Sequence, residues 1–417
     1  MSALQRQGLG KGVAAFLKAQ NLHIYLVGCA CHLINLAAER ASRQLSVNIE
    51  DFLITIYYYL DKSSKRKSNL RDIQIMCDTD VRKILKLAST RWLSLGQCVN
   101  RLLQQWDPLT GFFENEVDTG KKKKTKPSVS SKQPMPPSGP TQKPKAPPST
   151  SMPTEFDLSR FLFKQNEIGK RAAKEKNNPQ RTKKEEKKDL TKPEKVLQFL
   201  TNPMSKVYSL FLKRAIPIFD IGNQTLQKEE PCIQILLPTL KLQLQKVLLS
   251  FCKPEHVISM MKEIGRGIKP TLYSTGENQV PDEELSIGQE TQTFIQSQGN
   301  LELKPFFKDV RKFFSSAADY MVAKFPFGDE LLMHAVVADI ANRQSVKFRS
   351  LQFINRFPTI LPEEVTVDQV EDEFRMYQTT SFEESKRTDE AWPVEERRQG
   401  GLLQPVSSYA WDIGCLP

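Results

Sequence analysis

Residues 22–42 read LHIYLVGCACHLINLAAERAS. The apolar run that ends at Gly28 is typical of a buried strand, whereas the apolar residues after Cys31 recur at helical spacing. A Cys29-x-x-His32 pattern lies at the boundary between the apolar run and the helical pattern. We therefore expect a strand at 22–28, followed by a helix from about Cys31 to Arg43.

Helical patterns continue through most of the chain. Asn48 is a favourable N-cap, with Asp51 at the capping-box position, and the apolar residues that follow repeat at helical spacing. Asp107-Pro108 should interrupt a later helix, because proline disfavours helical geometry in the residue before it. Residues 264–300 are polar and predict a loop. The remaining predicted helices lie at 11–20, from 91 to 106, within 195–251, and at 302–324, 331–340 and 367–377.

Composition separates one segment from the rest of the chain. Residues 121–195 contain 21 Lys and Arg against 8 Asp and Glu, a net charge of +13. The whole chain carries +12, so the other residues sum to −1. This segment predicts a flexible connector with self-repelling charge. Its lysines are also candidates for a nuclear-import signal or for contacts with nucleic-acid phosphates. These candidates are Lys121, Lys122, Lys123, Lys124 and Lys126.

The chain has 417 residues, 26 prolines and seven scattered cysteines, and 39% of its residues are hydrophobic. An odd number of cysteines without a disulfide-like spacing fits a reducing compartment. The first residues do not form the apolar core of a secretory signal, and no apolar run reaches the length of a membrane span. We expect the protein in the nucleus, or else in the cytoplasm, with no membrane partner.

Two short motifs carry a resemblance to a known family. Gly28-Cys29-x-x-His32-x-x-Asn35-Leu36 and the later Ser89-Thr90-Arg91-Trp92 resemble the catalytic-core region of hAT (hobo-Ac-Tam3) superfamily transposases. Residues 12–116 resemble vertebrate zinc-finger BED-like domesticated copies of these enzymes, and 195–380 resemble them more loosely. The matching motif residues are Cys29, His32, Asn35, Arg91 and Trp92.

The resemblance implies a division of the chain. The family has an RNase H-like α/β core that an all-helical insertion interrupts, so the predicted fold is mainly α with a core remnant of one strand plus helices. The expected parts are a core remnant (1–45), the first part of the helical insertion domain (46–118), a basic Pro/Ser/Lys-rich disordered insert (119–194), the second part of the insertion domain (195–380) and an unstructured tail (381–417).

This sequence departs from the family pattern at the residues that the family uses for catalysis. Strand transfer in this family needs two metal ions held by three core carboxylates. Residues 1–36 contain no carboxylate, and neither the family's C-terminal glutamate motif nor its N-terminal BED finger is recognisable. We therefore expect a copy truncated at both ends, with no catalytic residue, no cofactor and no homodimer. A lone strand cannot satisfy its backbone, so Leu22–Gly28 should be marginal or pack irregularly.

Other chemical signals are weak. Cys29, Cys31 and His32 could bind zinc, but a structural site needs four ligands and no second pair follows, so we expect no metal. Trp92, which the resemblance associates with stacking on a displaced base, is expected to be a core aromatic. The leading hypothesis is a catalytically inactive, transposase-derived nuclear protein that binds nucleic acid or nuclear proteins. The alternatives are a fragment of a DDE-type DNA transposase and a protein-binding helical scaffold.

Overall fold

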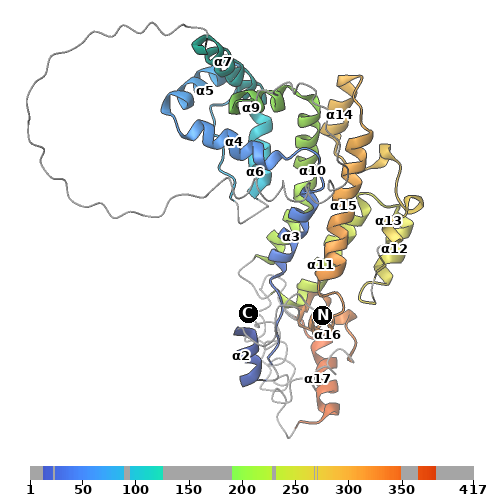
Figure 1. Ribbon diagram of the computed structural model, residues 1–417. Coiled ribbons are helices and arrows are strands. Elements are labelled where there is room, and N and C mark those ends of the chain that lie inside the picture. The colour runs from blue at the N-terminus through green and yellow to red at the C-terminus, as the bar shows by residue number, and fades with distance from the viewer. Residues whose placement is uncertain are drawn as a thin grey trace, which may run out of the picture. The chain divides into compact units, whose positions relative to one another are not determined.

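The computed structural model describes residues 13–21, 24–88, 94–124, 190–227, 232–266, 268–269, 271–348 and 365–381. These residues are mostly helical, which confirms the mainly α prediction (Figure 1). Their α-helices are α2 (Val13–Gln20), α3 (Ala30–Ser42), α4 (Ile49–Asp61), α5 (Ser64–Met76), α6 (Leu95–Gln104), α7 (Trp106–Lys124), α9 (Lys192–Thr201), α10 (Pro203–Leu226), α11 (Ile233–Leu249), α12 (Pro254–Lys262), α13 (Thr271–Ser274), α14 (Gln289–Gln298), α15 (Lys304–Lys324), α16 (Glu330–His334) and α17 (Val367–Thr379). Short 3-10 helices are η2 (Gly276–Asn278), η3 (Asp282–Glu284), η4 (Ala335–Ala338) and η5 (Ile340–Ser345).

The strand expected at 22–28 is not formed by its described part, residues 24–28. The described part of the chain contains no strand, so these residues have no neighbour with which to form a ladder of hydrogen bonds. Tyr25 instead packs against the helical core as a partly buried side chain. A strand is therefore not formed at 24–28, whereas the expectation that this segment packs irregularly agrees with its irregular backbone and with the position of Tyr25.

Helix α10 organises the core. It contacts α3, α4, α6, α9, α11 and α14. Asn202 caps its start by accepting a hydrogen bond from the Met204 backbone at 2.9 Å, and Pro203 occupies the first turn, where a missing N–H costs nothing. Because buried residues lie on several sides of α10, neighbouring helices can pack around it.

Aromatic side chains fill the space between α10 and α15. Phe211 of α10 makes edge-to-face contacts with Phe306, Phe313 and Phe314 of α15, at centroid distances of 6.0, 5.3 and 5.8 Å. Such pairs stabilise a core beyond the area they bury. The phenylalanine stripe predicted on 302–324 is thus core, and α15 also lies along α3 (Figure 1).

Of two local signals near α4 and α7, the first is confirmed and the second is displaced. The Asn48 side chain accepts a hydrogen bond from the Asp51 backbone at 3.2 Å, which confirms the N-cap of α4. The interruption expected at Asp107-Pro108 is instead at Gln105, between α6 and α7, and both Asp107 and Pro108 lie in the first turn of α7, where the missing N–H of proline costs nothing. Trp106 itself starts α7 and is buried.

The polar segment 264–300 is not the loop we expected, because it contains α14. Only Phe294 and Ile295 of α14 are large apolar residues packed against the core, so its hydrophobic pattern is too sparse to predict a helix. Glycines with positive φ, Gly288 (92°) and Gly299 (72°), flank it. The sequence did not predict α5 or α12 either, and the helix expected at 331–340 is α16 followed by η4.

The chain divides into two compact units. One is formed by Met1–Val117 together with Lys192–Pro417, and the other by Asp118–Thr191. All the helices above belong to the first unit, except the last part of α7. No helix among the described residues combines the length and the apolar character needed to cross a membrane.

Candidate functional site

Helix α3 carries the Cys-x-x-His motif. Cys29 is its N-cap residue, without a side-chain capping bond, and its carbonyl accepts a hydrogen bond from Leu33 N at 3.1 Å. The buried face of α3 is made of Ile34 and three alanines. Small side chains let neighbouring helices approach closely, and α3 contacts both α10 and α15. Packing therefore determines where the motif lies.

The motif side chains of α3 have different environments. Cys29 and His32 are exposed, whereas Asn35 is half-buried. The Oδ1 atom of Asn35 is buried and makes no hydrogen bond to the described residues. Cys31, which lies between Cys29 and His32 in the sequence, is half-buried and donates a weak hydrogen bond to the Asn223 carbonyl of α10 at 4.0 Å. The structure does not bring these residues together into one polar site. The other motif residues, Arg91 and Trp92, lie outside the described residues.

The chemistry of the cysteines favours packing over ligation. Burial, and secondarily the neighbouring Cys29, raise the pKa of the Cys31 thiol. A raised pKa keeps this group as the thiol, whereas metals bind the thiolate. Among the described residues, no three His, Cys, Asp or Glu side chains are arranged to hold a metal ion.

Side chains hold the extended segment that leads toward the Thr90-Arg91-Trp92 motif. Gln74 donates to the Arg82 carbonyl at 2.9 Å and to Gln105 Oε1 at 2.5 Å. Gln105 in turn donates to the Asp80 carbonyl at 3.1 Å. Ser94 Oγ accepts a hydrogen bond from the Ala88 backbone at 3.3 Å, so Ala88 and Ser94 lie next to each other.

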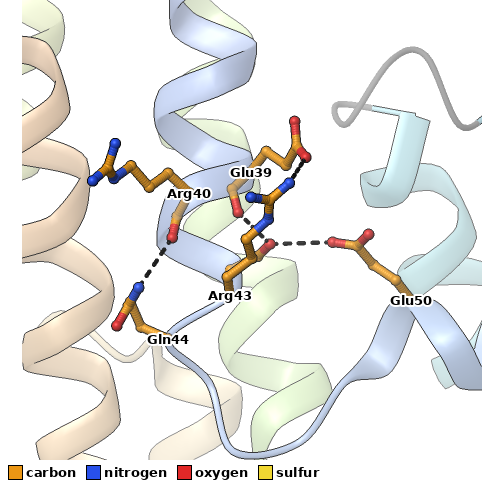
Figure 2. A network of polar contacts seen from close by, with 6 residues as sticks. Glu39, Arg40, Arg43, Gln44 and Glu50 are labelled. Carbon is orange, nitrogen blue, oxygen red and sulfur yellow. Dashed lines mark hydrogen bonds and ion pairs between the residues drawn. The ribbon is translucent and has the colours of Figure 1, made fainter. Parts of the chain in front are cut away.

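The C-terminal end of α3 is tied to the start of α4 (Figure 2). Ser42 Oγ donates to the Glu39 carbonyl at 2.9 Å and to Glu50 Oε1 at 3.1 Å. Arg43 pairs with Glu39 one turn earlier on α3. Because Ser42 and Glu50 belong to α3 and α4, these bonds constrain the connection between the two helices. The network stabilises the fold.

Two cavities lie elsewhere in the larger unit. The first, of about 440 Å³, lies near the start of α10, where Lys206 Nζ is 5.6 Å from the centroid of Trp106 and 5.4 Å from that of Phe294. Trp106 Nε1 already donates to the Leu200 carbonyl at 3.0 Å. The indole N–H of Trp106 is therefore already used within the core.

The second cavity is a groove of about 420 Å³ beside α15. We call it the α15 groove; it is lined by Ser274, Gln279, Asp282, Lys304, Phe307, Lys308, Arg311, Lys312 and Ser315. Four of these side chains are cationic and one is a carboxylate. Our sequence reasoning identified the helix but missed its basic face. The signal was present, since the lysines recur every four residues, which places them on one side of a helix.

The lysines predicted from the basic segment are not at a described site. Helix α7 continues to Lys124, so Lys121, Lys122, Lys123 and Lys124 extend a helix, but their side chains lie outside the described set. Lys126 lies outside the described residues altogether. No family model, no curated protein and no solved structure matches this chain.

Proposed function

We propose that this chain is a catalytically inactive protein derived from a hAT transposase, and that it acts in the nucleus by binding nucleic acid. In this proposal residues 1–45 are the remnant of the RNase H-like core, and Arg91 and Trp92 are inherited positions without a chemical role. The two motifs quoted above carry the proposed ancestry.

The uneven distribution of charge carries the proposed activity. A net charge of +13 lies within residues 121–195, against −1 for all other residues. Lysines that neutralise phosphates release bound counterions, and this release supplies most of the free energy of non-specific binding. Such binding does not depend on base sequence, because contacts to phosphates position a protein without reading bases.

The environment of α3 supports a structural role for the inherited motif. Gly222 of α10 lies so close that a Cβ atom there would be 3.2 Å from Ile34 Cδ1 of α3. Cys31 is engaged with the α10 backbone, and its raised pKa makes it a weak nucleophile. The motif helix therefore serves as a packing element between α10 and α15.

Replacing residues 125–189 with a Gly/Ser segment of equal length tests the proposal. This change keeps α7 and α9 whole, because they end at Lys124 and begin at Lys192. We expect most of the affinity for a labelled DNA duplex in an electrophoretic mobility assay to be lost. Tight binding by the replaced chain would contradict the proposal.

The protein-scaffold alternative needs its own measurement. Partners captured by the full chain should be released by nuclease treatment if nucleic acid bridges them. Partners that remain bound after nuclease digestion, together with absent DNA binding, would favour the scaffold over our proposal.

A further inference from the structure

The α15 groove presents a regular row of positive charge. Lys304, Lys308 and Lys312 line it at intervals of four residues, and all three side chains are exposed. Four residues of an α-helix rise by about 6 Å. The amines therefore repeat along one wall of the groove at a spacing that a chain of regularly repeated anions can match.

The row is held on a rigid support. On the opposite side of α15, Phe306, Phe313 and Phe314 are fully buried against the core. Asp309 adds a polar anchor, because its Oδ2 atom accepts hydrogen bonds from Tyr208 OH at 2.8 Å and from Ser46 N at 2.9 Å. A rigid helix loses little entropy when its exposed face binds a ligand.

The charges of the groove are only partly neutralised within the protein. Arg311 forms an ion pair with Asp282 at 2.6 Å and donates a hydrogen bond to Gln279 Oε1 at 3.1 Å. The one carboxylate of the lining, Asp282, is therefore already paired. Lys304, Lys308 and Lys312 form no ion pair among the described residues. The three lysines are therefore available to an anionic ligand, whereas Arg311 of α15 holds Asp282 on the opposite side of the groove.

An aromatic ring lies among these cations. Phe307 lines the groove, and it is partly buried beside Phe306 with ring centroids 5.5 Å apart. Proteins that bind single strands combine a basic groove along the backbone with aromatic rings on which bases stack. An acidic peptide would use the lysines but would gain little from the ring. The combination favours a nucleic acid with unpaired bases.

We infer that the α15 groove binds the sugar-phosphate backbone of single-stranded nucleic acid, with Lys304, Lys308 and Lys312 on successive phosphates and Phe307 against a base. The inference rests on the proposed association with nucleic acid. It adds a built site in the folded unit, separate from the basic segment 121–195. Because the three lysines lie on α15 and the one carboxylate of the lining, Asp282, is paired with Arg311, the strand should follow α15.

The test uses the full chain and a fluorescein-labelled dT20 strand, with binding followed by anisotropy between about 50 and 200 mM salt. The variant K304Q/K308Q/K312Q removes the row, and K62Q/K65Q/K86Q removes the same charge from exposed lysines elsewhere. We expect the groove variant to bind at least about tenfold more weakly and its log–log salt slope to fall by about 2, as the loss of three phosphate contacts requires. The control variant should change neither value by a comparable amount.

A second variant tests the aromatic contact. F307L keeps a partly buried apolar side chain and should weaken dT20 by about fivefold or more, with a smaller effect on a 20-base-pair duplex. Equal losses for both probes would contradict stacking. Circular dichroism and thermal unfolding of every variant exclude a folding defect as the cause.

The outcomes separate the two proposals. If the full chain fails to bind dT20 and duplex at about 50 mM salt, the proposed function and the groove are both wrong. If the chain binds and the Gly/Ser replacement weakens it, but the groove variant behaves as the control, then only the groove is wrong. Equal or tighter binding of a labelled polyglutamate peptide, lost in the groove variant, would also overturn the choice of nucleic acid.

Discussion

One oxygen of Asp309 accepts three hydrogen bonds. They come from Ser46 N at 2.9 Å, Ser46 Oγ at 2.5 Å and Tyr208 OH at 2.8 Å. The carboxylate thereby joins α15 to α10 and to the connection between α3 and α4. A buried charge survives only where donors compensate for its lost hydration, so this cluster should be sensitive to the loss of its centre.

We expect Asp309→Ala to lower the free energy of unfolding by about 2–4 kcal/mol, because it strands a buried hydroxyl and removes three charge-assisted bonds. Tyr208→Phe removes one donor and should cost about 1 kcal/mol. Urea denaturation followed by circular dichroism measures both. A double variant whose loss equals the sum of the two would show that the two residues act independently.

Tyr59 provides a pH-dependent signal. Burial, then the hydrogen bond to Glu116 and its charge, raise the pKa of Tyr59 to about 12. The folded state holds this proton more tightly than the unfolded state, whose tyrosine pKa is about 10. Its contribution to stability is thus complete below about pH 10 and is lost as the pH rises toward 12.

Between pH 9 and pH 11.5 the free energy of unfolding should fall less for Tyr59→Phe than for the wild type. Other buried tyrosines also titrate with raised pKa values, including Tyr273, whose hydroxyl donates to Asp319 at 2.7 Å. The comparison of the variant with the wild type isolates Tyr59. Identical pH profiles for the two chains would show that Tyr59 is not coupled to folding in this way.

At the scale of elements, the close packing of α3, α10 and α11 offers the most direct test of the fold. Gly222 of α10 faces both neighbours: an added Cβ would lie 2.6 Å from Gln243 Oε1 and 3.2 Å from Ile34 Cδ1. Gln243 cannot move freely, because it is buried and donates to the Ile218 carbonyl at 2.6 Å.

We therefore expect Gly222→Ala to destabilise the protein by about 1–3 kcal/mol, although alanine normally stabilises a helix interior by about 1 kcal/mol. Gly111→Ala, in the interior of α7, is the matched control, since its Cβ would make an ordinary contact, 3.7 Å from Ile73 Cγ2. Thermal unfolding of the two variants gives the comparison. A stabilised Gly222→Ala protein would contradict the packing of α3 against α10.

The sequence allowed most of the long helices to be predicted, for identifiable reasons. Helices α4, α15 and α17 combine a capping signal or a dense apolar stripe with a clear boundary. Helix α14 escaped prediction because its burial depends on α10, a partner distant in sequence. The continuous apolar run also could not distinguish a strand from an irregular segment at 24–28, since both can be partly buried against a core.

The candidate site was less predictable than the fold. Cys29, His32 and Asn35 were correctly placed on or next to a helix, but burial and partners depend on α10 and α15, which the motif does not encode. The lysines of the α15 groove were visible as a spacing, yet an exposed basic face is ordinary on a helix. The groove exists because η3 and residues 274–279 pack beside that face.

At the scale of the whole molecule, the helices that form the core and the excess of positive charge lie in different parts of the sequence. The helices that form the core belong to residues 1–117 and 192–417, whereas the excess of positive charge belongs to residues 121–195. The stability predictions above concern the first, and we expect the proposed binding of nucleic acid to depend mainly on the second.

The salt dependence of DNA binding by the full chain tests the proposed function most directly. We expect the logarithm of the binding constant to fall linearly with the logarithm of the salt concentration, with a slope steeper than about −4, as more than four neutralised phosphates require. The Gly/Ser replacement of residues 125–189 should lose most of that slope. Binding that is insensitive to salt, or unchanged by the replacement, would contradict a nucleic-acid-binding role based on this charge.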